Sequence, residues 1–411
     1  LTGSVGGSLL GQLPHAGEAD VWLGKFTPSG ASAYWIITFG TALNDMAMDM
    51  KIAPDGTIWI AGATAGAIGP GGRACCANHQ DDLTNVWVAQ YSTDGEQLSL
   101  DQFGDGINCF FNDMGIDDEG NVYISLQSFH DIETKKSNGY LSPVLMKYDA
   151  DGNKLWTKQY GGDKDQRFGS LAVVGDGTCY MVTQTLDLSE AGRVRPDSEI
   201  TNAMGNMRIQ CFDSDGAELW SQDHGSELRD IPQDIALDAL NEELVIVGQT
   251  WGDLCEPQQG RSDAFLFRTD LDGNWLSGIH MGTDMPEHFS SVIVDDEGTV
   301  FVEGNSSKPM ANMIGGGTAL MIAYDVDNEP LWQLQFGSPT IGENLNGSTL
   351  MPTGDGGLFL AGNTDGTLVG ANAGGQDLVL VRFALPELAE AEPAPSLRDQ
   401  PTLTMPVQPT P

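Results

Sequence analysis

Three series of glycines recur at intervals of about sixty residues along the chain. The clearest series, with spacings of 65, 57, 64 and 57 residues, comprises Gly30, Gly95, Gly152, Gly216 and Gly273. A second series comprises Gly56, Gly120, Gly177, Gly298 and Gly356, with Asn241 in the remaining place. A third comprises Gly40, Gly104, Gly161, Gly225, Gly282 and Gly337. Because the three series stay in phase, they predict a tandem array of equivalent structural units.

Each unit has the pattern of four short strands. In residues 111–161 these segments are FNDMGID, NVYISLQ, PVLMKYD and KLWTKQYG. They are rich in β-branched and aromatic residues and are bounded by turn residues, whereas helical periodicity is nearly absent. Four-stranded units repeated around a ring are typical of a β-propeller, which leaves only short sheet edges. The sequence therefore predicts an all-β propeller of antiparallel four-stranded blades.

Two phrases resemble a known repeat family. SDAFLFRTDLDGNWLSGIHMG, residues 262–282, and GIDDEGNVYISLQS, residues 115–128, resemble the SBBP-type β-propeller repeat of secreted bacterial proteins. The resemblance extends over residues 1 to about 385. It implies a propeller fold and an exported, extracellular or cell-surface protein, but it specifies no activity, because propellers support many unrelated functions.

The repeat count favours seven blades, with six as the alternative. Residues 1–39 supply three strands of one blade, and its inner strand is expected upstream of Leu1. Residues 1–385 are expected to form the propeller and residues 386–411 a Pro-rich extended tail.

The charge balance restricts the partners of the protein. Lys and Arg number 19 against 58 Asp and Glu, which gives a formal net charge of −39. Such a surface repels nucleic acid and anionic membranes, so neither is an expected partner. The sequence contains no apolar run long enough to insert into a membrane. Other protein chains and glycans remain as expected partners.

The Asp-Gly segments raise the question of calcium binding. The weak calcium candidates are Asp149, Asp151, Asp213 and Asp215, in the segments DADGNK and DSDGAE. An EF-hand-like loop requires further oxygen ligands and a bidentate carboxylate downstream, which are absent here. The same segment recurs in other units without its carboxylates, as in TPSGAS. We therefore interpret these segments as hairpin turns, and calcium is the only cofactor considered.

Long connections gather on one predicted face of the propeller, where binding sites are common. They are residues 65–85, 128–142, 185–205, 250–262, 306–317 and 364–376. The first contains Cys75, Cys76 and His79, a cluster that could bind zinc, but no second ligand cluster follows it.

The cysteines of an exported protein usually form disulfides. Cys179 is expected to begin the second strand of its blade and Cys211 to end the third, so a cross-strand disulfide is predicted between them. Cys109 is predicted to pair with Cys75 or Cys76. Buried free thiols are the alternative to both pairings, and metal binding is less favoured.

Familiar catalytic motifs are missing from the sequence. His224 and His280 lie near the ends of predicted outer strands, where packing is favoured over catalysis. Carboxylates approach the predicted inner strands near the central channel: Asp45 and Asp113, each preceded by Asn, and Asp165, Asp230 and Asp234. A ring of this kind could bind cations or cleave glycans, but its repetition also fits a structural feature of the blade.

The Pro-rich tail carries apolar residues that could anchor it. Leu397, Leu403, Met405 and Val407 are the candidates, and the segment TLTMPV could add a strand to an exposed sheet edge. In the final unit no outer-strand segment directly follows LVLVRF, so the final blade is expected to offer such an edge. Pairing with a neighbouring chain is slightly favoured over pairing within the chain.

These observations lead to a functional expectation with alternatives. The favoured hypothesis is a non-enzymatic structural or binding subunit of an extracellular or cell-surface assembly. The alternatives are a glycan-active lyase or hydrolase with central-channel carboxylates, and a calcium-dependent adhesin.

Overall fold

The computed structural model describes residues 1–5, 17–27, 32–69, 85–104, 109–132, 137–161, 164–186, 205–306, 308, 319–336, 345–352, 357–364, 377–384 and 402–404. Among these residues every regular secondary-structure element is a β-strand, and none is a helix. Consequently this part of the chain holds no helix of the length and apolar character needed to span a membrane. The chain divides into two compact units, Leu1–Ala203 with Arg208–Ser221 and Met204–Met207 with Gln222–Pro411.

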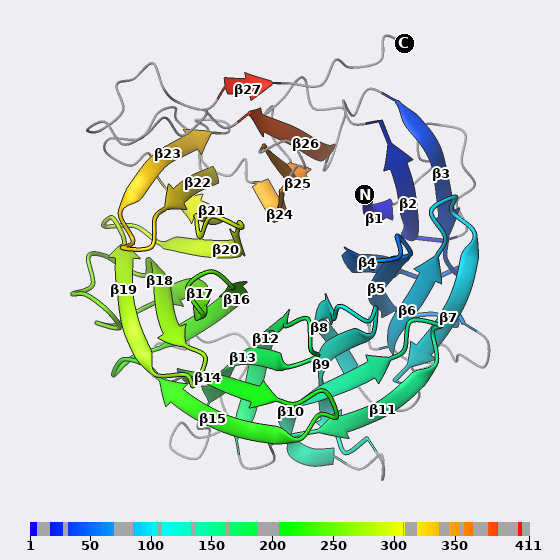
Figure 1. Ribbon diagram of the computed structural model, residues 1–411, viewed down its shortest axis with the longest axis horizontal. Coiled ribbons are helices and arrows are strands. Elements are labelled where there is room, and N and C mark those ends of the chain that lie inside the picture. The colour runs from blue at the N-terminus through cyan, green and yellow to red at the C-terminus, as the bar shows by residue number, and fades with distance from the viewer. Residues whose placement is uncertain are drawn as a thin grey trace. The chain divides into compact units, whose positions relative to one another are not determined.

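The strands form seven antiparallel sheets, the blades of a seven-bladed β-propeller (Figure 1). The first sheet has three strands, β1 (Thr2–Val5), β2 (Asp20–Phe26) and β3 (Ala33–Phe39). The second contains β4 (Asp45–Ile52), β5 (Ile58–Thr64), β6 (Asn85–Tyr91) and β7 (Gln97–Phe103). The third contains β8 (Cys109–Ile116), β9 (Val122–His130), β10 (Ser137–Tyr148) and β11 (Lys154–Gln159). The fourth contains β12 (Asp165–Val173), β13 (Cys179–Leu186), β14 (Gly205–Phe212) and β15 (Glu218–His224).

The remaining three sheets also have four strands each. The fifth contains β16 (Asp230–Asp238), β17 (Glu243–Thr250), β18 (Asp263–Asp270) and β19 (Trp275–Met281). The sixth contains β20 (Glu287–Val294), β21 (Val300–Ser306), β22 (Ala319–Tyr324) and β23 (Pro330–Phe336). The seventh contains β24 (Leu345–Pro352), β25 (Leu358–Thr364), β26 (Asp377–Ala384) and β27 (Thr402–Thr404). The expectations of seven blades and of three strands in the first blade are confirmed.

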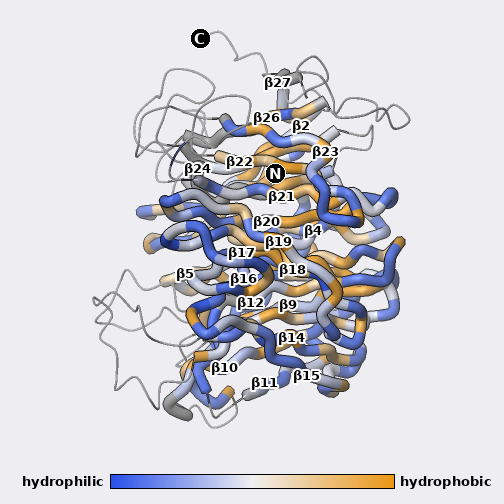
Figure 2. Tube along the Cα trace, turned by 90° about the vertical axis from the view of Figure 1, so that its left-hand side faces the viewer, coloured by the Kyte–Doolittle hydropathy of each residue, from blue (hydrophilic) through white to orange (hydrophobic). Residues whose placement is uncertain are grey.

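The hydrophobic core lies between successive sheets. All seven residues of β6 are buried, because a middle strand is covered on both faces of its blade. One core cluster joins Trp59 of β5 and Val88 of β6 to Phe111, Ile124 and Val144 of the third sheet. Figure 2 shows the resulting pattern, with apolar colour along the strands and hydrophilic colour at many of the turns between them.

The glycine series mark hairpin turns. Gly95, Gly152, Gly216 and Gly273 have φ values of 83°, 86°, 73° and 80°, in the left-handed region that glycine adopts without strain. In the sixth sheet Asn328 takes the same conformation, with φ of 62°. In the turn where the sequence places Asn241 in the glycine series, the left-handed residue is instead Glu242, with φ of 55°.

A second glycine position explains a β-bulge in the inner strands, which we define as the first strand of each four-stranded sheet. The register shifts between Ala47 and Asp49 of β4, so that the strand bulges at Met48. A Cβ on Gly62 of the paired strand would lie 1.9 Å from the carbonyl oxygen of Met46. Gly248 and Gly304 meet the bulged strands β16 and β20 in the same way. In these three blades the glycine gives room to the bulged strand, whereas β8 and β12 bulge opposite Leu126 and Gln184.

The tail completes the last sheet of its own chain. Thr402–Thr404 pairs antiparallel with Arg382–Ala384, so β27 occupies the outer position of the seventh sheet. The predicted strand addition by TLTMPV is thus found within the chain, and the slight preference for a neighbouring chain's edge is not what the structure shows. Leu397, Met405 and Val407 lie outside the described residues, and for Leu403 only the backbone pairing is described.

Candidate functional site

The carboxylates that begin the inner strands are engaged in a repeated clip. Asp45, buried at the start of β4, accepts hydrogen bonds from the amide of Thr41 at 2.5 Å and from the hydroxyl of Thr64. Thr41 lies in the connection before β4, and Thr64 ends the neighbouring strand β5. Burial raises the pKa of Asp45 in spite of these hydrogen bonds. The clip ties a connecting loop and two strands together.

Two other blades contain the same clip. Asp230 accepts from the amide of Ser226 at 2.6 Å and from the hydroxyl of Thr250 at 2.5 Å. Glu287 accepts from the amide of Thr283 at 2.8 Å and from the hydroxyl of Ser306 at 3.0 Å. Burial raises the pKa of both acids. The sequence singled out Asp45 and Asp230 but not Glu287. The available signal was a recurring spacing. A Thr or Ser precedes the acid by four residues, and another Thr or Ser ends the next strand.

Asp165 occupies the corresponding place in β12 with different partners. Its carboxylate accepts from the amide of Leu141 at 2.8 Å and forms an ion pair with Arg167 at 2.9 Å. Each of these buried carboxylates is engaged by neighbouring segments of the fold.

Asp113 and Asp234 connect successive inner strands. Oδ2 of Asp113 accepts from the hydroxyl of Ser170 and from the amide of Leu171, both at 2.7 Å, in β12. Oδ2 of Asp234 accepts from the amide of Val292 in β20 at 2.8 Å. Each acid follows the bulge in its strand, which directs the side chain toward the next blade.

Asp49 occupies the same place in β4, directly after the bulge. The group that the next blade places near it is a carboxylate, that of Asp113. Lys51 lies between the two acids, with Nζ 3.2 Å from Oδ2 of Asp49 and 4.0 Å from Oδ1 of Asp113. The side chains of Lys51, Asp49 and Asp113 are 42%, 21% and 18% exposed. These three residues, which we call the Asp49–Lys51–Asp113 cluster, bring two partly exposed carboxylates to one ammonium on adjacent inner strands. Sequence analysis identified Asp113 but missed Asp49 and Lys51.

The calcium candidates lie in two hairpin turns, in which the carboxylates of Asp149 and Asp213 accept hydrogen bonds from their own turns. Oδ1 of Asp149 accepts from the amides of Asp151 and Asn153 at 3.1 and 2.8 Å. Asp213 accepts in the same way from the amides of Asp215 and Ala217. These are Asx turns, in which the side chain caps the backbone of its own turn. Within the described residues no group of three potential ligands gathers around a common point.

The same turns hold neighbouring blades together through their carbonyls. Lys147, on the third strand of its blade, donates to the carbonyl of Ser214 at 3.2 Å, and Lys158 of the outer strand donates to that of Asp215 at 2.5 Å. Gln90 donates to the carbonyl of Ala150 at 2.7 Å. The recurrence of the turns therefore has a structural cause: each turn accepts hydrogen bonds from the preceding blade.

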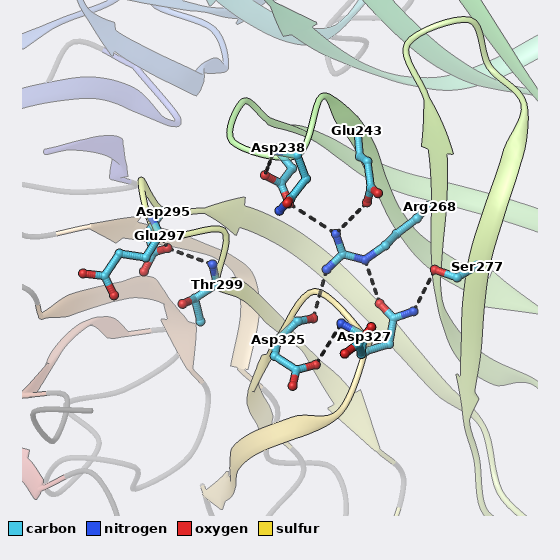
Figure 3. Close-up of polar contacts among 11 residues, drawn as sticks. Asp238, Glu243, Arg268, Ser277, Asp295, Glu297, Thr299, Asp325 and Asp327 are labelled. Atoms are coloured by element: carbon cyan, nitrogen blue, oxygen red, sulfur yellow. Dashed lines mark hydrogen bonds and ion pairs between the residues drawn. The ribbon is translucent and has the colours of Figure 1, made fainter. Parts of the chain in front are cut away.

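A buried arginine forms the most extensive version of this contact (Figure 3). Arg268 of β18 is 1% exposed. It donates to Asp238, the last residue of β16, at 3.3 Å and to Glu243, the first residue of β17, at 3.1 Å. It also donates to the side chain of Asn328 at 2.7 Å and to the carbonyl of Asp325 at 3.1 Å, both in the turn of the sixth sheet. Figure 3 shows the guanidinium directed between these turns. Sequence reasoning missed this group, because its members are up to 90 residues apart in the chain.

The predicted Cys179–Cys211 disulfide is wrong. Both residues are buried thiols, and that of Cys179 donates to the carbonyl of Gly177 at 3.5 Å. Cys109 is also a buried thiol and forms no disulfide in the described part of the chain. Its predicted partners Cys75 and Cys76, like His79, lie outside the described residues. Burial raises the pKa of Cys109 to about 12, which keeps its thiol protonated and unreactive.

The two histidines named from the sequence lie in packed surroundings. Nε2 of His224 is 2.8 Å from the carbonyl oxygen of Gly273, and its ring packs on Phe267. Nε2 of His280 accepts from the amide of Cys255 at 3.1 Å, and Nδ1 is 3.7 Å from Oδ2 of Asp263. Burial lowers the pKa of His280, so its ring is neutral near pH 7. The packing role expected for both residues agrees with these contacts.

Comparison with known proteins gives matches in structure but not in sequence. No family model and no curated protein matches the chain. A protein of unknown function from Dyadobacter fermentans DSM 18053 has a TM-score of 0.49 and 11% identity, covering 82% of this chain and 93% of its own. The polysaccharide lyase Uly1 has a TM-score of 0.46 and 13% identity, covering 88% and 84%. An alpha-L-arabinofuranosidase from Fusarium graminearum has a TM-score of 0.42 and 9% identity, covering 76% and 86%.

These comparisons correct one expectation and leave another as a prediction. The expectation of a non-enzymatic protein rested on missing motifs, and it is contradicted because similar structures include ones named as glycan-cleaving enzymes. The likenesses are too weak to assign any of those activities to this chain. The resemblance to SBBP-type repeats stays a prediction, whereas the propeller fold is confirmed.

Proposed function

We propose that the protein is a glycan-active hydrolase whose acid–base residues are Asp49 and Asp113. The supporting observation is the Asp49–Lys51–Asp113 cluster, in which both carboxylates lie within 4.0 Å of the same ammonium. Glycoside hydrolysis uses two carboxyl groups placed on either side of one glycosidic bond. Of the inner-strand acids, Asp45, Asp230 and Glu287 are unsuited to this role because their carboxylates are buried in the clip.

The chemistry requires a proton on one carboxyl group and a charge on the other. The protonated group donates to the leaving glycosidic oxygen, while the carboxylate activates water or attacks the anomeric carbon. Asp113 is positioned by Ser170 and Leu171, so its geometry is fixed by the next blade. Nζ of Lys51 contacts both acids and compensates the carboxylate that stays charged. Which acid donates the proton is left to the variants below.

The net charge narrows the proposed substrate class. A chain with net charge −39 repels uronate-rich polysaccharides, which disfavours the lyase alternative. Neutral or amino-sugar glycans carry no such penalty. An extracellular or cell-surface location and a role within a larger assembly remain proposals that are compatible with this substrate class.

Turnover of a panel of neutral and amino-sugar oligosaccharides tests the proposal. Replacing Asp49 or Asp113 by Asn is expected to reduce kcat by roughly 100-fold or more, as for loss of an acid–base group. Asp215→Asn is the matched control, because Asp215 lies in an exposed outer turn. The proposal fails if the protein cleaves no panel member, or if the control loses as much activity as the inner-strand variants.

A further inference from the structure

The loop between β17 and β18, residues 251–262, is fixed at both ends. At its start the amide of Trp251 donates to the carbonyl of Arg229 at 2.9 Å. Near its end the amide of Gln259 donates to Oδ2 of Asp263 at 2.8 Å. The loop is one of the long connections singled out in the sequence, and loops of this kind commonly carry binding sites. The contacts that hold its middle against the sheet therefore bear on function.

Two hydrogen bonds tie the middle of the loop, residues 253–258, to the outer strand β19, and both involve His280. The amide of Cys255 donates to Nε2 of the ring at 3.1 Å, and the backbone amide of His280 donates to Oε2 of Glu256 at 3.2 Å. Gly278 on the same strand leaves room for the cysteine, because a Cβ there would lie 2.5 Å from Sγ of Cys255. His280 thus anchors this segment.

The hydrogen bond from Cys255 defines the protonation state of the His280 ring. A ring nitrogen that accepts a hydrogen bond carries no proton, so the proton of the neutral ring is on Nδ1. Nδ1 lies 3.7 Å from Oδ2 of Asp263, and both side chains are 0% exposed. The contact between the ring and the loop therefore requires a neutral imidazole.

Burial and nearby carboxylates act on this ring in opposite directions. Burial is the larger influence, and it lowers the pKa of His280. Three carboxylates favour the charged ring: Asp263 of β18, and Glu256 and Asp253 of the loop. The thiol of Cys255 contributes no charge, because burial raises its pKa to about 12. Acidification therefore places a charge on a buried ring that has a carboxylate on one side and the amide of the loop on the other.

We propose that His280 is a pH-sensitive latch, which holds residues 253–258 against β19 at neutral pH and releases them on acidification. Protonation of Nε2 places an N–H group opposite the amide of Cys255, and two donors form no hydrogen bond. The imidazolium is instead attracted to the carboxylate of Asp263. Because closure buries the ring and disfavours its charge, the closed loop is favoured above the ordinary pKa of 6.5 and is lost progressively as the pH falls below it. The latch is independent of the proposed hydrolase activity.

Hydrogen exchange followed by mass spectrometry tests the latch. Protection of residues 253–258 is the intrinsic exchange rate divided by the measured rate at the same pH, which removes the chemical pH dependence of exchange. In the wild type this protection is expected to fall at least tenfold between about pH 7.5 and about pH 4.5. Peptides from β17 and β18 are expected to lose less protection, which distinguishes release of the loop from unfolding of the sheet.

Variants assign the effect to one side chain. His280→Gln is expected to abolish the loss of protection on acidification, because glutamine does not titrate. His224→Gln is the matched control and is expected to retain the loss: His224 also lies on an outer strand, with Nε2 2.8 Å from the carbonyl oxygen of Gly273. In Asp263→Asn the loss is expected to require a lower pH, because the carboxylate that attracts the imidazolium is absent.

The outcomes that would overturn the proposal are distinct. They are unchanged protection of residues 253–258 at the lower pH, an equal loss in β17 and β18, and the same loss in His280→Gln as in the wild type. Circular dichroism verifies that the variants remain folded. If His280→Gln does not fold, Asp263→Asn decides the question, and a loss at the same or a higher pH than in the wild type would overturn the latch.

Discussion

Asp230 and Thr250, at the start of β16 and the end of β17, are joined by a buried hydrogen bond of 2.5 Å. The same carboxylate accepts from the amide and hydroxyl of Ser226 in the preceding connection. One acid thus fixes the entry of the inner strand to its own sheet and to the loop before it. Its recurrence as Asp45 and Glu287 makes the clip a property of the blade rather than of one site.

Removing the clip is expected to destabilise the fold. Asp230→Ala removes the acceptor of the Ser226 amide and one of the two acceptors of the Thr250 hydroxyl, in a buried environment, which costs roughly 2–4 kcal/mol. Asp296→Ala, in an exposed turn, is expected to change the free energy of unfolding by less than about 0.5 kcal/mol. Urea unfolding followed by tryptophan fluorescence measures both. Equal effects of the two substitutions would show that the clip contributes no stability.

The clip also predicts a pH dependence with a definite sign. Burial raises the folded-state pKa of Asp230 above the ordinary value of 3.8, so the folded protein holds this proton more tightly than the unfolded chain. The stability associated with the group is therefore fully present below the ordinary value and is lost as the pH rises through the raised one. Asp230→Asn removes this titration while keeping a hydrogen-bond acceptor.

The measurable quantity is the difference in unfolding free energy between the wild type and Asp230→Asn. It is expected to favour the wild type more at about pH 3 than at about pH 8. Only the wild type loses the stability linked to the Asp230 proton as the pH rises between these values. Urea unfolding at several pH values, at low protein concentration, measures the difference. A difference that instead grows in favour of the wild type with rising pH would contradict the assigned sign.

The sequence predicts the repeating parts of this molecule well and the contacts between repeats poorly. The repeat count predicts the blade number, and the glycine series marks hairpins because a hairpin requires a left-handed residue at a fixed place, which is Asn328 in the sixth sheet. The role of Asp45 depends on Thr64, which strand pairing brings to it, as well as on its local partner Thr41. Cys179 and Cys211 lie on neighbouring strands as expected, yet strand proximity alone does not orient two sulfur atoms for a bond.

The buried arginine offers a test of contacts that link blades. Arg268→Met is expected to destabilise the protein by roughly 3–5 kcal/mol, because Asp238 loses its buried charge partner. Lys154→Met is the matched control: Lys154 pairs with Asp101 at 2.9 Å, but both side chains are more than a third exposed. An exposed pair contributes at most about 1 kcal/mol.

A double substitution separates charge from packing at this position. If the loss in Arg268→Met comes mainly from the unpaired Asp238 carboxylate, adding Asp238→Asn is expected to restore part of the stability. Urea unfolding of the four proteins of the cycle measures the coupling. Additive effects of the two substitutions would show that the pair is not coupled and that the loss reflects packing alone.

The buried thiols of the structure can be distinguished by experiment from the disulfide that the sequence predicts. Cys109 and Cys179 are buried, and burial raises the pKa of both thiols, so the reactive thiolate is suppressed in the folded state. Iodoacetamide is therefore expected to leave both residues unmodified in the folded protein and to modify both after denaturation without reductant. Peptide mass spectrometry locates the modified residues, and Cys255, which is only partly buried, indicates how far exposure alone governs the reaction. Recovery of a Cys179–Cys211 linked peptide from the non-reduced protein would show that the two strands hold a disulfide. Modification of these residues only after addition of reductant would lead to the same conclusion.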